Sequence, residues 1–191
     1  DLFNYMALIV CARARDYAEI TFHKFADELE AKDAAGQYAF GAPENEKHRV
    51  TWEGIAVWTY LGATFKGLKN QGAVMTGSAY PGLWSLVYTP GDLESMAEAY
   101  TNVYINTCGP NRYEEFYKVV KNSKSDGIVL HLNRSCKLMG LLNNEGAEYV
   151  NAKLGVPYVS FDGDQTDPRV FTPAQYETRV QALTEMMDEN Q

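Results

Sequence analysis

The sequence predicts an α/β domain with a doubly wound, mostly parallel, four-stranded sheet that is flavodoxin- or Rossmann-like in general form. From residue 48 onward, short apolar runs alternate with segments of helical periodicity. The run "DGIVLHL" at 126–132 is short, apolar and bounded by polar residues, which is typical of a strand buried on both faces. Strands separated by helices form βαβ units with right-handed crossovers, and therefore a parallel sheet.

An N-terminal helical segment precedes this domain. Residues 1–34 are expected to be helical, with an apolar face at i, i+3, i+4 and i+7 made by Phe22, Phe25, Ala26 and Leu29. Glycines and a proline in "AAGQYAFGAPENEKH" then indicate a linker. We therefore divide the chain into a helical segment and linker, 1–42, and a C-terminal α/β domain, 43–191. Helical periodicity already runs at the first residue, so we expect the chain to continue an N-terminal domain that it does not contain.

The elements of the α/β domain follow in order. "HRVTWEGI" (48–55) is a strand that ends at Glu53-Gly54, and 58–71 is a helix weakened by two glycines. The segment 72–78 is a second strand, and 80–91 is irregular. Two helical stripes follow, Leu93, Met96, Ala97, Tyr100 and Tyr104, then Tyr113, Phe116, Tyr117 and Val120.

The second half of the domain continues the alternation. After the strand at 126–132, a helix is expected to bury a face made by Leu138, Leu141, Leu142 and Tyr149. A fourth strand lies in "VPYVSFDGD" (156–164). In the final helix Thr172 is the expected N-cap, Pro173 lies in the first turn and Gln175 completes a capping box. Its buried face is expected to be Tyr176, Val180, Leu183 and Met187.

Composition excludes several classes of function. The formal net charge is -8, which argues against nucleic acid or an anionic membrane as the main partner, because binding phosphates requires Lys and Arg. No run of about 18 apolar residues is present, so no transmembrane helix is expected. Three cysteines, an odd and sparse number, indicate a reducing compartment, with the cytoplasm as the default. Phosphate-loop, dinucleotide and serine-hydrolase motifs are absent from the sequence.

The cysteine in "NRSCK" is the leading site candidate. Ligands of such sheets bind at the carboxyl ends of the strands, and Cys136 follows the third strand there. We expect it in the first turn of a helix beside Ser135 as N-cap, where the helix dipole, Arg134 and Lys137 favour thiolate. The alternative is a small buried cysteine that only fills space. Cys11 is expected to be structural, and Cys108 to have no chemical role.

Other polar residues near the strand ends have plainer interpretations. His131 is expected to be a hydrogen-bonded structural histidine, and His23 and His48 to lie on the surface. "DGDQTDPR" (162–169) resembles half a calcium loop, but no glutamate completes it. Its aspartates are therefore expected to cap turns and to pair with Arg169. Glu53, at a strand end, is either an acid or base or, more commonly, a solvated or paired carboxylate.

Three stretches together resemble the C-terminal half of the 2-hydroxyacyl-CoA dehydratase family. They are "TWEGIAVW", "HLNRSCK" and "LGVPYVSFDGDQTDPRVFTPAQYETRVQALTEMM", and the similarity runs from about residue 48 to the end. That family includes 2-hydroxyglutaryl-, lactoyl- and 2-hydroxyisocaproyl-CoA dehydratases, with benzoyl-CoA reductase subunits as relatives. DQTDPR followed by Q-x-x-T-R is its most distinctive part here.

The resemblance implies an anaerobic lyase made of two related subunits, a heterodimer, each with a [4Fe-4S] cluster held by three cysteines. Cys136 matches the ligand that comes from the C-terminal domain, and Asn133, Arg134 and Ser135 would be donors to cluster sulfurs. A separate ATP-driven activator delivers one electron. The thioester of an (R)-2-hydroxyacyl-CoA becomes a ketyl radical anion and loses water to give the 2-enoyl-CoA. The two N-terminal cluster cysteines of the family are missing here, so this chain alone is expected to be inactive.

Other functions stay open at this stage. One is an acyl-CoA reductase of the benzoyl-CoA type, or an electron-transfer subunit that binds a cluster and no substrate. A second is a non-catalytic α/β scaffold module, in which Cys136 would affect packing alone. A third is a thiol-nucleophile enzyme, for which His131 is the one nearby histidine in sequence.

Overall fold

The computed structural model describes residues 2–12 and 15–190. The chain forms two compact units, Asp1–Glu46 and Lys47–Gln191. In the first, the expected single helix is two, α1 (Leu2–Cys11) and α2 (Asp16–Ala34), and the 3-10 turn η1 (Pro43–Asn45) follows. Tyr5 of α1 stacks on Phe25 of α2, with ring centroids 4.2 Å apart. The predicted buried face of α2 is wrong, because no residue of this helix is buried and Leu29 is 51% exposed.

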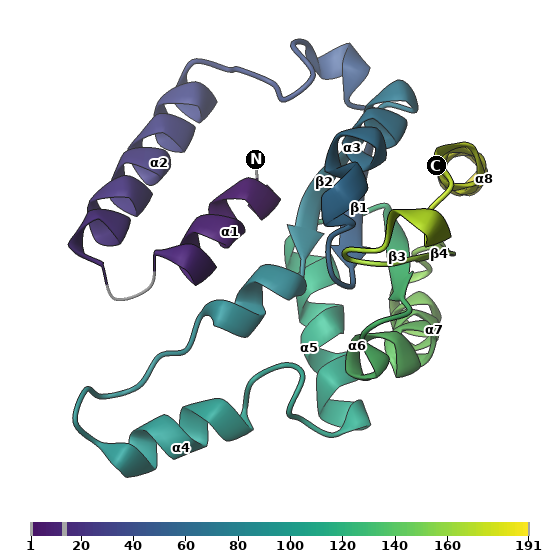
Figure 1. Cartoon of the computed structure of the whole chain (residues 1–191). Coiled ribbons are helices and arrows are strands. Elements are labelled where there is room, and N and C mark those ends of the chain that lie inside the picture. The colour runs from purple at the N-terminus through teal and green to yellow at the C-terminus, as the bar shows by residue number, and fades with distance from the viewer. Residues whose placement is uncertain (1, 13–14, 191) are drawn as a thin grey trace. The chain divides into compact units, whose positions relative to one another are not determined.

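The second unit is built on a four-stranded parallel sheet, as predicted, with strand order β2-β1-β3-β4 (Figure 1). The strands are β1 (His48–Glu53), β2 (Ala73–Ser78), β3 (Gly127–Asn133) and β4 (Tyr158–Gly163). β1 and β3 are central and almost wholly buried. Both are rich in β-branched and aromatic residues, which suits strands that helices cover on both faces.

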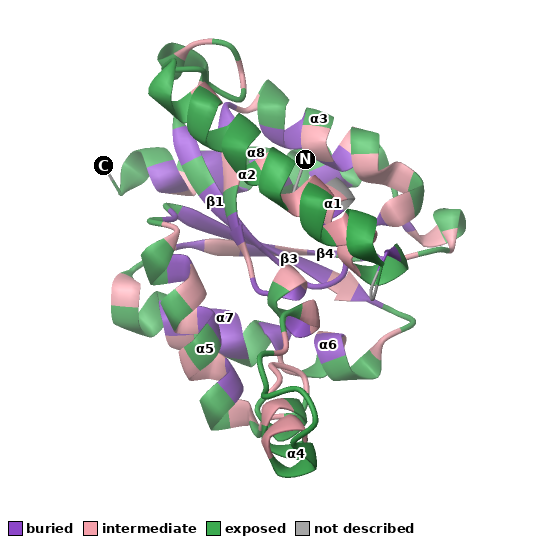
Figure 2. Cartoon of the chain, turned by 90° about the vertical axis from the view of Figure 1, so that its left-hand side faces the viewer, coloured by how far each residue is buried: buried purple, intermediate pink, exposed green. Residues whose placement is uncertain are grey.

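Helices cover the two faces of the sheet, as Figure 2 shows. α3 (Leu61–Asn70) and α8 (Pro173–Glu189) pack together on one face. α5 (Gly109–Asn122) and α7 (Asn143–Leu154) pack together on the other. Short elements connect them, namely η2 (Trp58–Tyr60), η3 (Tyr80–Trp84), α6 (Lys137–Leu141) and η4 (Pro168–Val170).

The final helix agrees with the sequence in its buried face and differs at its cap. Its predicted core positions Tyr176, Val180, Leu183 and Met187 are all at most 1% exposed. Thr172 is the N-cap, but its side chain makes no capping hydrogen bond, so the capping box is not formed. Pro173 at the first position starts the helix without a cap because its fixed φ already suits a helix.

Two predicted helical faces are wrong. α4 (Leu93–Thr101) has no buried residue, and Leu93 is 75% exposed. The stretch after β3 is two helices, α6 and α7, in which Leu138 and Leu141 are 60% and 70% exposed. The buried positions there include Met139, Ala147 and Val150. No helix in the described part of the chain is long and apolar enough to cross a membrane.

Candidate functional site

Cys136 lies just beyond the carboxyl end of β3, where the sequence places it. It is the N-cap of α6, one position earlier than predicted, and it is partly exposed. Its backbone N–H donates to the Asn133 carbonyl (3.3 Å), and its own carbonyl accepts from the Gly140 N–H (3.0 Å). A tight turn therefore connects the last residue of the strand to the thiol.

Asn133 ties the turn before Cys136 to the loop after β4. Its Oδ1 accepts from the backbone N–H of Ser135 (3.2 Å) and of Gln165 (3.3 Å). Its Nδ2 donates to Oε1 of Gln165 at 3.3 Å. Asn133 is buried, so these bonds replace contacts with water and hold the two loops in one register.

Asp164 makes the second connection between these loops. Its Oδ2 accepts from the Ser135 hydroxyl, and its Oδ1 accepts from the backbone N–H groups of Thr166 (2.8 Å) and Asp167 (2.9 Å). These donors, Ser135 first, hold the pKa of the Asp164 carboxyl well below its usual range. The ion pair of Asp167 with Arg169 (2.6 Å) lowers the pKa of Asp167 to about 2. The prediction that these aspartates cap turns and pair with Arg169 is confirmed.

The three residues predicted as donors to a cluster are engaged in different ways. Ser135 and Asn133 direct their side-chain donors to Asp164 and Gln165 within the protein. Arg134 is 59% exposed, with its Nε 3.6 Å from Oδ1 of Asp162. Ser135 precedes the N-cap and does not cap the helix itself. Their role toward a cluster stays a prediction.

Glu53, at the end of β1, is a paired and fully buried carboxylate. Its Oε1 accepts from the Tyr104 hydroxyl (2.8 Å) and lies 3.7 Å from a guanidinium nitrogen of Arg112. Burial raises the pKa of Glu53 to about 7, although Arg112 and Tyr104 oppose that shift. Burial likewise raises the pKa of Tyr104 well above its usual value.

Sequence reasoning missed both partners of Glu53. Arg112 is 2% exposed, and Tyr104, placed in a helical stripe, follows the end of α4. A signal did exist in the sequence, because Arg112 precedes the core residue Phe116 by four positions and so lies on the same helical face. A lone arginine on an apolar face requires a buried partner.

His131 is a structural histidine, as predicted. It is fully buried, its Nδ1 pairs with the Ile55 carbonyl at 2.5 Å, and its ring stacks on Phe161. Burial lowers the pKa of His131, so the ring is neutral at physiological pH. His23 is exposed, as predicted. The surface prediction for His48 is wrong: it is 2% exposed, and its Nε2 lies 3.1 Å from Oδ1 of Asp188.

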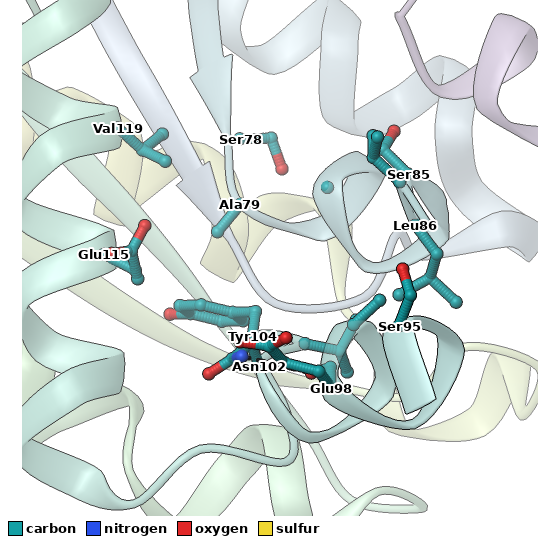
Figure 3. A pocket seen from close by; sticks show the side chains of 14 residues that line it. Ser78, Ala79, Ser85, Leu86, Ser95, Glu98, Asn102, Tyr104, Glu115 and Val119 are labelled. Carbon is teal, nitrogen blue, oxygen red and sulfur yellow. Dashed lines mark hydrogen bonds between the residues drawn. The ribbon is translucent and has the colours of Figure 1, made fainter. Parts of the chain in front are cut away.

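A pocket of about 510 Å³ lies beside the end of β2, between the segment after η3 and helices α4 and α5 (Figure 3). The Tyr104 ring lines it, while the Tyr104 hydroxyl bonds to Glu53. Its lining includes two carboxylates, Glu98 and Glu115, and no basic side chain among the described residues. Such a lining repels phosphate.

The described residues supply one thiol at this edge of the sheet. Cys108, the N-cap of α5, is exposed, and so is Cys11, which belongs to the other unit. No group of three or more His, Cys, Asp or Glu side chains within the described ranges could hold a metal ion. Iron–sulfur clusters are held mainly by cysteine thiolates. Cys136 therefore suits such a cluster as one ligand, and this chain does not complete the set.

The fold and the thiol at its carboxyl edge agree with the relatives of the chain. The family model "2-hydroxyglutaryl-CoA dehydratase, D-component" matches residues 1–187, and the chain belongs to this family. The match includes the N-terminal segment, so the similarity begins earlier than residue 48, where the sequence motifs placed its start.

Individual relatives agree with the family match. The chain is 61% identical to the lactoyl-CoA dehydratase subunit alpha of Anaerotignum propionicum, covering 100% of this chain and 45% of the relative. It is 43% identical to the (R)-2-hydroxyisocaproyl-CoA dehydratase alpha subunit of Clostridioides difficile, covering 99% and 46%. A benzoyl-CoA reductase subunit of Thauera aromatica is 26% identical, over 78% and 36%. The chain spans less than half the length of these relatives.

Proposed function

We propose that this chain is part of a subunit of an iron–sulfur 2-hydroxyacyl-CoA dehydratase, a lyase that removes water from an (R)-2-hydroxyacyl-CoA to give the 2-enoyl-CoA. The observation that carries the proposal is the position of Cys136. A partly exposed thiol stands at the carboxyl edge of a parallel sheet, where such folds bind ligands, in a chain of the dehydratase family.

The relatives support dehydration over reduction. Dehydratase subunits match at 37% to 61% identity, and the benzoyl-CoA reductase subunit matches at 26% over a shorter range. The relative at 61% is named for lactoyl-CoA, so a short 2-hydroxyacyl thioester is the first substrate to test. The alpha-subunit names also support a heterodimer with a second, related subunit. A separate ATP-dependent activator belongs to the same proposal.

In this proposal, residues of the chain position one cluster ligand. A [4Fe-4S] cluster supplies one-electron chemistry when bound. Cys136 provides one thiolate, while Asn133 and Asp164 hold the two loops that flank it. The fixed loops keep the thiol in one orientation, which a cluster shared between separate parts of a protein requires. The remaining ligands come from outside the described residues.

The test is anaerobic iron and sulfide analysis with electron paramagnetic resonance on the complete subunit and its partner. Wild type is compared with Cys136→Ala, and Cys108→Ala serves as the matched control. We expect the cluster to be lost or altered in Cys136→Ala and to be unchanged in Cys108→Ala.

Two other results would contradict the proposal. An unchanged cluster in Cys136→Ala would remove this residue from the site. A wild-type protein without iron would favour a scaffold module. Turnover of lactoyl-CoA to the enoyl thioester, with a one-electron donor, separates a dehydratase from an electron-transfer subunit, which would hold a cluster and leave the thioester unchanged.

A further inference from the structure

We propose that Arg112 is a positioning residue for Cys136: from α5 it holds the backbone of α6, the short helix that the cysteine begins. This inference rests on the proposed role of Cys136 as a cluster ligand for its functional meaning. Its structural part, a coupling between Arg112 and the order of the Cys136 turn, can be tested separately.

The first step is that α6 has little stability of its own. It contains five residues, and its N-cap, Cys136, makes no side-chain capping bond. A helix this short leaves most of its backbone carbonyls without intrahelical partners. Met139 is its buried side chain, whereas Leu138 and Leu141 face solvent. Contacts from other elements must therefore hold it.

Arg112 supplies such contacts. One guanidinium nitrogen donates to the Leu138 carbonyl at 2.6 Å. The other donates to the Met139 carbonyl at 3.4 Å and to Oδ1 of Asn143, the first residue of α7, at 3.0 Å. These acceptors lie on both sides of the junction between α6 and α7. The planar fork of an arginine can satisfy several acceptors at once, which a lysine cannot do.

The second step is that the fold keeps this guanidinium in place. Its side chain is 3% exposed, and Glu53 at the end of β1 is the nearby countercharge. The Tyr104 hydroxyl fixes the same carboxylate, and the Tyr104 ring lies 4.8 Å from the guanidinium carbon. Because leaving a buried charge uncompensated is costly, Glu53 and Tyr104 hold Arg112 against the α6 carbonyls.

The consequence concerns the orientation of the thiol. Leu138 and Met139 lie two and three residues after Cys136, within the first turn of α6. If the Arg112 bonds are lost, these carbonyls stay unpaired in a largely buried setting, and α6 opens more often. Opening the first turn frees the N-cap residue, so Cys136 would sample other orientations.

The test uses the full chain and measures each cysteine separately. Wild type, Arg112→Gln and the milder Arg112→Lys are treated with iodoacetamide, and peptide mass spectrometry gives the alkylation rates of Cys11, Cys108 and Cys136. Hydrogen exchange is read on the peptide that contains Gly140, whose N–H bonds to the Cys136 carbonyl. Val180→Ala, a fully buried change on α8, is the control for a general loss of stability.

We expect alkylation of Cys136 and exchange at Gly140 to be about tenfold faster in Arg112→Gln, and faster by a smaller factor in Arg112→Lys. The rates of the other two cysteines are expected to stay unchanged, and Val180→Ala to leave all three near wild type. Equal rates in Arg112→Gln and Val180→Ala would overturn the proposal. If Arg112→Gln does not fold, Arg112→Lys decides the same comparison.

A cluster readout connects the coupling to function. In the complete subunit, Arg112→Lys is expected to shift the electron paramagnetic resonance signal of the cluster, while Val180→Ala leaves the signal unchanged. An unshifted signal would overturn the positioning role. If instead Cys136→Ala leaves the cluster intact, the proposed function fails, and the alkylation and exchange rates still decide whether Arg112 orders the Cys136 turn.

Discussion

The Ser135 hydroxyl donates a hydrogen bond to Oδ2 of Asp164, and this contact joins the loop after β3 to the loop after β4. Ser135 immediately precedes Cys136, so the contact acts on the residue next to the thiol. Asp164 is 3% exposed and also accepts two backbone N–H groups of its own loop. Its carboxylate is therefore the common anchor of both loops.

Asp164→Ala is expected to lower the free energy of unfolding by about 2 kcal/mol, because it removes charge-assisted hydrogen bonds and leaves their donors unpaired. Urea denaturation of the chain measures this loss. Asp162→Asn is the matched control, because Asp162 is 62% exposed and its nearest cation is 3.6 Å away. Equal midpoints for the two variants would show that the Asp164 anchor adds nothing to stability.

Glu53 predicts a pH dependence of stability. Its pKa of about 7 in the folded chain exceeds the ordinary value of 4.5, so between these values the folded state binds more protons than the unfolded state. The stability that Glu53 contributes is fully present below pH 4.5 and is lost as the pH rises through about 7. Glu53→Gln does not titrate, so the difference in unfolding free energy between wild type and this variant should change over about pH 5–8.

The comparison also removes the contribution of His131, whose lowered pKa acts in the opposite direction below pH 6.5. His131 is present in both proteins, so its effect cancels in the difference. Parallel pH curves for wild type and Glu53→Gln would contradict the raised pKa of Glu53.

Tyr104→Phe tests the hydrogen bond to Glu53. The hydroxyl lowers the pKa of Glu53 and so partly offsets the effect of burial. Without it the pKa should rise further, and the window of pH-dependent stability should move upward. The phenyl ring still faces Arg112, so the effect is confined to the lost bond. Unfolding curves over the same pH range measure the shift, and an unmoved window would mean that this bond does not affect the carboxyl.

Gly54→Ala is expected to destabilise the chain by at least about 3 kcal/mol. Gly54 has φ +103°, and a Cβ atom there would lie 2.5 Å from the His131 carbonyl oxygen. Gly62→Ala is the control, because its Cβ would enter open space in α3, and it should stabilise the chain by about 0.5–1 kcal/mol. Thermal unfolding of both variants checks the prediction, and a small loss for Gly54→Ala would contradict it.

The fold class was predictable because apolar runs and helical periodicity are local properties. β3 is almost wholly buried, and the four buried positions of α8 follow its period of about 3.6 residues. The same reasoning failed for α4 and for Leu138 and Leu141, whose apolar faces are exposed in the described structure. Periodicity shows which residues share a face, but it does not show what that face contacts.

The candidate site was predictable only in part. Cys136 could be located from one strand end, since the carboxyl ends of parallel strands share an edge. The contacts around it could not. Asn133 meets Gln165, Ser135 meets Asp164, and Glu53 meets Arg112, in each case across at least 29 positions of sequence. Such pairings depend on the register and stacking of separate elements.

The sequence by itself determined the parallel α/β architecture, the strand end that carries the thiol and the family, because each depends on residue type at short spacing or on a local motif. Only the tertiary structure decided that Glu53 is buried and paired, that His48 is not on the surface, and that Arg112 holds the helix after Cys136. The physical reason is that burial raises the cost of an unpaired charge, and burial is a property of the packed chain.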